Sequence, residues 1–288
     1  MISATSAAEA RAAFPNGLEQ PPASFRFGAD ALLLAAWAAR QARGPCRDVA
    51  ELGSGCGAAL FALLLQPGLS SLPSRLLGLD VDEELCQAAR RNALRLGFAD
   101  RCAFVCGDLR DRAIVRSCGL RQFDLVLANP PFHAPGCGRT SAQPRRDRAV
   151  REPLPLAGHA ALLRDFCAAA AALLRHHGRF FCIFPARDIS RLLSALRQCD
   201  LGLRALLPVQ ARADAPALRV LVEARRQAAD DCCLLPPLVL HASPGSGGPD
   251  WTDAAREFCP RLTASARCGP MEDMEDTART SSRQSALP

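Results

Sequence analysis

Short apolar segments and longer amphipathic segments alternate along the chain from Asp48 onward, and this alternation restricts the fold more than any other feature. The first apolar segments, DVAEL (48–52) and RLLGLD (75–80), are typical of strands, and segments typical of helices follow each of them (58–66 and 82–97). Parallel strands need crossover connections of this length. Nearly continuous apolar strands are typical of sheets buried on both faces. The sequence therefore predicts an α/β fold with a doubly wound, mostly parallel sheet and helices on both faces.

The same pattern continues and sets the expected limits of the domain. Further strands are predicted at 101–108, 123–129, 178–185, 203–208 and 218–225, with helices over 159–176 and 188–198 and a final extended stretch at 232–241. A helix with Asp30 as its N-cap is expected before the first strand and should stop near Gly44. We expect a flexible arm over 1–20, one domain over 21–242, and a disordered tail over 243–288, where Gly, Pro, Ser and acidic residues predominate.

Composition excludes several classes of protein. No apolar run reaches the roughly 18 residues of a membrane span, and the first residues lack a signal-peptide pattern; we expect a soluble, cytoplasmic protein that does not bind membranes. The chain has 14 cysteines but no CxxC pair, so we expect neither zinc nor disulfides, and no other metal. All 35 basic residues are arginine. Without lysine the chain can form neither a P-loop nor a Schiff base with pyridoxal phosphate.

A glycine-rich turn follows the first predicted strand. Its sequence, Glu51-Leu-Gly-Ser-Gly-Cys-Gly57, has GxGxG spacing rather than the GxGxxG of dinucleotide-binding folds. Glycines permit a tight turn and a close approach of backbone N–H groups to a ligand. Glu51 would serve a pyrophosphate poorly, whereas it would tolerate a cationic sulfonium with an amino-acid end. The turn favours S-adenosylmethionine over NAD.

Two more acids follow the next two predicted strands. Asp80 ends the second and could accept both ribose hydroxyls; Asp108 follows the third and could meet an adenine amino group. A single aspartate after a strand more often caps a helix. Three acids at successive strand ends, beginning with a glycine turn, indicate a cofactor site. The expected cofactor-binding residues are Phe27, Glu51, Gly53, Ser54, Gly55, Gly57, Asp80, Val81, Asp108, Leu109 and Asn129.

The fourth predicted strand ends in Asn129-Pro130-Pro131-Phe132. Two prolines cannot continue a ladder, so a turn is expected whatever its role. The chemistry of the turn goes further. An exocyclic amine on a ring is a poor nucleophile because its lone pair is delocalised. The Asn129 amide oxygen and the Pro130 carbonyl could each accept one N–H and direct the lone pair toward a methyl group, while Phe132 stacks on a flipped base. We predict that these four residues are catalytic.

Taken together, these motifs resemble class I S-adenosylmethionine-dependent amino-methyltransferases with a [D/N/S]PP[Y/F] signature. FRFGAD (25–30), before the glycine turn, resembles the RFGxDAxLL element of the valine-tRNA adenine-N6 methyltransferases, and LRVLVE (218–223) and LLPPLVLH (234–241) are similar to that group as well. The likeness spans about residues 25–241 and implies a Rossmann-like methyltransferase fold acting on tRNA. NPPF in place of NPPY, an inserted Pro/Ser-rich loop at 66–74 and the acidic tail depart from the pattern.

A basic segment follows the NPPF turn. Residues 139–151 carry a net charge of +4 and five arginines: Arg139, Arg145, Arg146, Arg148 and Arg151. Charge runs are usually solvated surface, but at this position arginines could hold RNA phosphates while the target base enters the site. We therefore expect these five to bind RNA.

Other functions remain open at this point. Guanine-N2 methylation of ribosomal RNA and glutamine-N5 methylation of protein share the NPP chemistry, although 50 residues before Glu51 leave little room for the helical substrate domain of the protein-modifying enzymes. A binding module that keeps the fold without activity would be expected to show a damaged glycine turn or NPP element, and both are intact. A nicotinamide dehydrogenase is disfavoured by the GxGxG spacing, a cytosine-C5 enzyme by the lack of a cysteine at the turn, and a lysine-dependent ribose methyltransferase by the lack of lysine.

Overall fold

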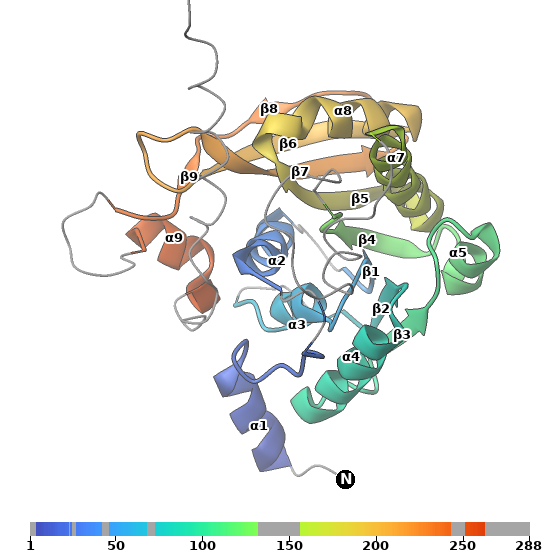
Figure 1. The fold of residues 1–288 in the computed structure, drawn as a ribbon, viewed down its shortest axis with the longest axis vertical. Coiled ribbons are helices and arrows are strands. Elements are labelled where there is room, and N and C mark those ends of the chain that lie inside the picture. Colours follow the sequence, from blue (N-terminus) through green and yellow to red (C-terminus); the bar gives the residue numbers. More distant parts are fainter. Residues whose placement is uncertain are drawn as a thin grey trace, which may run out of the picture.

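One nine-stranded sheet runs through the part of the chain that the structure describes (Figure 1). This structure is a computed structural model, and it describes residues 4–22, 24, 27–41, 46–67, 73–131, 156–242 and 251–262. The strands are β1 (Asp48–Leu52), β2 (Arg75–Asp80), β3 (Cys102–Cys106), β4 (Phe123–Ala128), β5 (Leu174–Pro185), β6 (Leu201–Gln210), β7 (Ala217–Arg226), β8 (Cys233–Leu234) and β9 (Leu238–Val239). The helices are α1 (Ala4–Ala13), α2 (Ala29–Gln41), α3 (Ala58–Leu64), α4 (Glu83–Leu96), α5 (Arg112–Gly119), α7 (Leu156–Leu173), α8 (Ile189–Gln198) and α9 (Asp253–Phe258).

The strand order is β3-β2-β1-β4-β5-β7-β6-β8, with β9 also paired to β6. The first five strands in this order pair in parallel. Only β7, between β5 and β6, runs antiparallel to its neighbours. The predicted fold, a mostly parallel doubly wound sheet, is confirmed.

Helices cover both faces because successive strand residues point to opposite sides. On β4, Leu125 and Leu127 pack in a core with α2, α3 and α4. Their neighbours Val126 and Ala128 pack in a second core with α5, α7 and α8. Figure 1 shows these two sets of helices on opposite sides of the sheet. All six residues of β4 are buried, as its nearly continuous apolar sequence predicts, and they include Asp124.

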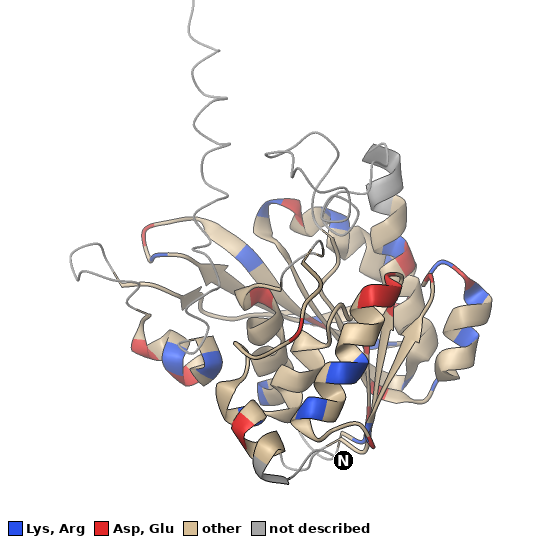
Figure 2. Ribbon diagram, turned by 60° about the horizontal axis from the view of Figure 1, so that its bottom comes forward, with Lys and Arg blue, Asp and Glu red and all other residues tan. Residues whose placement is uncertain are grey.

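The helix α4 illustrates how local sequence sets element ends. The Asp82 side chain accepts hydrogen bonds from the backbone N–H groups of Glu84 and Leu85, and Gly97 closes the helix with a φ of 72°. Figure 2 shows acidic residues at the start of the helix and arginines further along it, the distribution that complements the helix dipole. Both ends agree with the sequence prediction.

The structure differs from the sequence expectation at both ends of the chain. Residues expected in a flexible arm form α1, where Arg11 Nε donates to the carbonyl of Leu96 (2.8 Å) on α4. Residues expected in a disordered tail form α9, and Cys259 beyond it is fully buried against α2. Neither segment has a strong apolar period, because each buries only a few small side chains. The short helix α5 was not predicted either.

Asp30 is not the N-cap of its helix, as the sequence suggested, because α2 begins one residue earlier, at Ala29. Its carboxylate instead pairs with Arg219 on β7, with Nε and Oδ2 3.0 Å apart and side-chain exposures of 7% for the arginine and 14% for the aspartate. The ion pair fastens the first turn of α2 to the sheet. The sequence alone could not reveal a partner 189 residues away.

We expect Asp30→Ala to lower the free energy of unfolding by about 3–5 kcal/mol, because it leaves a buried guanidinium without its carboxylate. The matched control is Asp48→Ala, which breaks the more exposed Arg75–Asp48 pair (44% and 32% exposed) and should cost less than about 1 kcal/mol. Urea unfolding of both variants measures the difference. Equal losses would show that the Asp30–Arg219 pair contributes no more than a surface pair.

Candidate cofactor and active site

The candidate site lies along the edge of the sheet where the parallel strands end. Pairing of Leu52 with Ala128 places the glycine turn after β1 beside Asn129 after β4. Pairing of Asp80 with Cys106 places the ends of β2 and β3 side by side. The topology therefore brings the residues predicted from four separate motifs to one edge, which we call the carboxyl edge.

The glycine turn is held by hydrogen bonds to the end of β2 and by one bond within the turn. The N–H groups of Gly53 and Ser54 donate to the carbonyl of Leu79 (2.8 and 3.1 Å), and that of Gly57 donates to Ser54 (2.9 Å). The Gly55 N–H donates to Oδ2 of Asp80 (2.7 Å). These four amides already have partners within the protein. The turn therefore offers a ligand space and shape rather than this set of donors, which differs from the sequence expectation.

Two of the glycines show why side chains are excluded from the turn. Gly57 has a φ of 87°, and a Cβ there would lie 2.5 Å from the ring of Phe61. Gly55 has a φ of 53°, and a Cβ there would meet no atom of the described residues within 4 Å, which leaves open space above it in this part of the structure. Positive φ values disfavour any other residue at both positions. The open side of the turn at Gly55 is where a ligand can approach the backbone.

Asp80 joins β2 to this turn. Its Oδ2 accepts from Gly55, and its Oδ1 accepts from the N–H of Asp82 (2.9 Å). Burial raises the pKa of the carboxyl above its ordinary value, and the two backbone donors offset part of that rise. Each carboxylate oxygen keeps a second lone pair. An ionised Asp80 can therefore accept two further hydroxyl donors in a fixed orientation.

Glu51 is a buried acid beneath the turn, with only 3% of its surface exposed. Its Oε2 accepts a hydrogen bond from the N–H of Leu60 (3.3 Å). Burial raises the pKa of Glu51 well above its ordinary value, and the nearby charge of Asp80 adds to that rise. Because burial makes it costly to ionise both Glu51 and Asp80, a positive charge nearby would stabilise their ionised forms. This is the electrostatic property expected of a sulfonium site.

The remaining predicted cofactor residues lie along the same edge with different surroundings. Asp108 follows β3, and its hydrogen bonds with Arg110, whose Nη2 lies 2.7 Å from Oδ2, hold the pKa of its carboxyl below the ordinary value. Val81 exposes 62% of its surface directly after Asp80, as an apolar platform for a ring. Leu109 packs partly against the core. The Ser54 hydroxyl is buried against Gly78.

Asn129 follows β4 and carries the most informative atom of the site. Its Oδ1 is buried and accepts no hydrogen bond from any described residue. A buried amide oxygen without a donor costs about 1–3 kcal/mol. Pro130 is buried and Pro131 half-buried, so the backbone after Asn129 is held rigidly. The turn therefore presents a hydrogen-bond acceptor, Asn129 Oδ1, for which the described residues supply no donor.

Phe27 precedes a helix, whereas the other predicted cofactor residues lie at or after the ends of strands. Phe27 is half-buried before α2, where its N–H donates to Oε1 of Gln20 (3.1 Å) and its ring packs against the first core. Phe132 and the arginines predicted to bind RNA lie outside the described residues. Sequence reasoning missed Asn92, a buried polar residue on the inner face of α4. Its signal was an amide at a position where the helical period calls for an apolar side chain.

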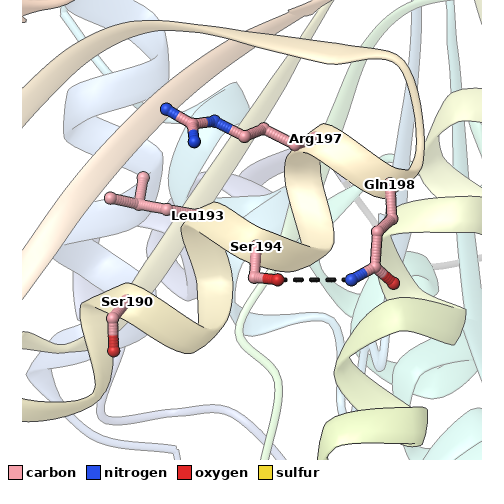
Figure 3. Close-up of a pocket in the computed structure, with 5 residues that line it drawn as sticks. All are labelled: Ser190, Leu193, Ser194, Arg197 and Gln198. Carbon is pink, nitrogen blue, oxygen red and sulfur yellow. Dashed lines mark hydrogen bonds between the residues drawn. The ribbon is translucent and has the colours of Figure 1, made fainter.

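A shallow hollow elsewhere on the surface is unrelated to this edge. It is lined by Ser190, Leu193, Ser194, Arg197 and Gln198, all from one side of α8 (Figure 3). The Gln198 Nε2 donates to the Ser194 hydroxyl there (3.2 Å). None of these residues follows a strand that carries a predicted motif.

Among the described residues, no helix is long and apolar enough to cross a membrane, and no group of three potential metal ligands occurs.

Comparison with solved structures defines the class of the fold. A predicted O-methyltransferase from Agrobacterium tumefaciens matches with a TM-score of 0.61 and 20% identity, covering 81% of this chain and 96% of its own. A putative class I S-adenosylmethionine-dependent methyltransferase from Listeria monocytogenes matches with a TM-score of 0.53 and 12% identity. The match covers 90% of this chain and 79% of the Listeria chain. The chain has the class I methyltransferase fold.

Sequence relatives define the family. A tRNA1(Val) (adenine(37)-N6)-methyltransferase from Pectobacterium carotovorum is 30% identical over 204 residues, which are 71% of this chain and 75% of the relative. A protein of the same name from Porphyromonas gingivalis is 29% identical over 249 residues, which are 84% of this chain and 91% of that relative. The chain belongs to the tRNA1(Val) (adenine(37)-N6)-methyltransferase family, which confirms the resemblance seen in its motifs. No protein-family model matches the chain.

We expect Asp80→Ala to raise the dissociation constant for S-adenosylmethionine about 10- to 100-fold, because two charge-assisted hydroxyl contacts are lost. The matched control is Asp82→Ala. It removes the cap of α4 two residues away, which should cost about 1 kcal/mol of stability and leave cofactor affinity unchanged. Calorimetric titration of both variants is the measurement. Wild-type affinity in Asp80→Ala would remove this residue from the cofactor site.

Proposed function

We propose that this protein transfers the methyl group of S-adenosylmethionine to the exocyclic N6 amine of adenine 37 in a tRNA. The observation that carries the proposal is the Oδ1 of Asn129, which is buried beside the glycine turn and accepts no hydrogen bond from the described residues. Membership of the family and the names of its relatives point to the same chemistry. A tRNA substrate also favours a cytoplasmic location.

The residues present fit S-adenosylmethionine. Gly55 leaves open space above the turn, Asp80 has acceptors for ribose hydroxyls, and Val81 offers an exposed apolar surface beside it. The raised pKa of Glu51 and Asp80 means that a nearby positive charge would stabilise their ionised forms. The cofactor supplies an electrophilic methyl group on a cationic sulfur.

Asn129 and Pro130 would then prepare the acceptor nitrogen. The amide oxygen of Asn129 accepts one N–H of the amine, and the carbonyl of Pro130 accepts the other. These contacts favour a pyramidal nitrogen whose lone pair points at the methyl carbon. The new N–C bond forms as the S–C bond breaks, and the proton leaves the nitrogen for solvent afterwards. No base has to act before the transfer.

The alternatives share parts of this geometry. Guanine-N2 and glutamine-N5 transfer need the same two acceptors, so Asn129 alone does not separate them. The names of the relatives favour adenine. A binding module without activity would be expected to show a damaged NPP element, and this element is intact here. Nucleoside analysis by mass spectrometry after incubation with bulk tRNA and labelled cofactor distinguishes N6-methyladenosine from the other products.

We expect Asn129→Ala to lower kcat about 10²- to 10³-fold, as does loss of one preorganised polar partner in other enzymes, while KM changes little. Phe132→Ala should instead raise KM for the RNA, since about 1–3 kcal/mol of base stacking is lost. Phe132→Tyr keeps the ring face and should be nearly neutral.

Single-turnover methyl transfer, with melting temperatures measured alongside, separates chemistry from folding. If the turn were only architecture, the rates of both alanine variants would follow their folded fractions. A folded Asn129→Ala that transfers methyl groups at the wild-type rate would refute amine activation by this residue.

We further propose that the arginines at 139–151 contact RNA phosphates. Replacing Arg145 and Arg146 by alanine should flatten the dependence of log affinity on log salt by roughly 1–1.5, at about 0.7 per phosphate contact. The control replaces Arg191 and Arg197 on α8, which changes the net charge equally. Filter binding over a range of salt measures the slope, and equal changes in both variants would show a general charge effect instead of a local contact.

A further inference from the structure

Asn92 lies in the middle of α4 with 1% of its surface exposed, and its amide is bonded at both ends. Its Nδ2 donates to the carbonyl of Cys56 (3.2 Å) and to the carbonyl of Glu19 (3.0 Å). Its Oδ1 accepts from the N–H of Glu19 (2.8 Å). Both of its N–H donors are therefore used, along with one lone pair of its oxygen.

The three bonds join two segments that are far apart in the sequence. Cys56 is in the glycine turn, between two glycines with positive φ. Glu19 precedes Gln20, whose side chain holds the N–H of Phe27. Asn92 thus connects the turn to the segment that leads to Phe27.

We propose that Asn92 is a positioning residue for the cofactor: from α4 it fixes the glycine turn, which borders the cofactor in the proposed function on which this inference rests, and it ties Glu19 to the same point. Glycines leave the turn with a wide choice of backbone conformations. A carbonyl at its centre therefore needs an outside donor to stay in one orientation. Asn92 supplies that donor from a rigid helix, and it touches neither the methyl group nor the acceptor amine.

The neighbouring residue Arg91 provides a control within the same helix. Its guanidinium pairs with the Glu19 carboxylate, with Nε 2.9 Å from Oε2 and Nη2 2.6 Å from Oε1. This pair is half-exposed and ties the same segment to α4 without reaching the glycine turn. Arg91→Met therefore loosens the segment and leaves the bond to Cys56 intact.

We expect Asn92→Asp to raise the dissociation constant for S-adenosylmethionine about tenfold or more, because the carboxylate faces two carbonyls and loses both donor bonds. Since this variant buries a charge, Asn92→Ala is measured as well. It removes the bond to Cys56 without adding charge and should raise the dissociation constant about 3- to 10-fold. At saturating cofactor, kcat should fall less than threefold in Asn92→Ala, and Arg91→Met should bind the cofactor like the wild type.

Calorimetric titration with S-adenosylmethionine, single-turnover rates and melting temperatures distinguish the outcomes. Wild-type cofactor affinity in folded Asn92→Ala would overturn the inference. So would an equal loss of affinity in Arg91→Met, because docking of the segment would then be sufficient. A loss confined to kcat would also contradict it. If the wild-type protein itself bound no S-adenosylmethionine, the proposed function would fail, and this outcome is separate from the other three.

Discussion

The parallel pairing of β1 between β2 and β4 is the constraint on which the site depends. Parallel strands all end at the same edge, and the loops that follow them meet there. The register of β1 with β4 places the glycine turn next to Asn129, and that of β1 with β2 places it over Asp80. A shift of one residue in either pair would turn the buried side chains of the strand to the opposite face. The two packed cores therefore determine the geometry of the site.

The electrostatics of the edge follow from the same burial. Glu51 and Asp80 lie close enough to influence each other, and both are withdrawn from water. In such surroundings a carboxylate is costly unless a positive charge or several donors accompany it. Backbone N–H groups from Leu60, Gly55 and Asp82 offset part of the cost. In the proposed function, the positive charge of the cofactor would offset more of this cost.

Much of this arrangement could be predicted because it depends on local sequence. The strands at 48–52 and 75–80 have the predicted limits, and α4 has the caps that Asp82 and Gly97 indicate. The glycine turn, Asp80 and Asn129 followed from residue type and spacing.

What could not be predicted depends on partners distant in sequence. The sequence predicts Asp30 to be a helix cap, whereas in the structure its carboxylate pairs with Arg219. The helices α1 and α9 are held by contacts with α4 and α2 rather than by patterns of their own.

Hydrogen bonding separates the groups that build the site from the groups that serve a ligand. The turn amides of Gly53 and Gly55 and the Asn92 amide all have partners inside the protein, so they contribute rigidity. The Asn129 oxygen has none among the described residues, although it is buried. Such an atom costs stability in the free protein, and in the proposed function the amine would supply its donor. An oxygen already fixed in place needs no reorganisation when that donor arrives, and it can therefore favour the transition state over the bound substrate. In the proposed function, this fixed orientation is what would let Asn129 act on the amine.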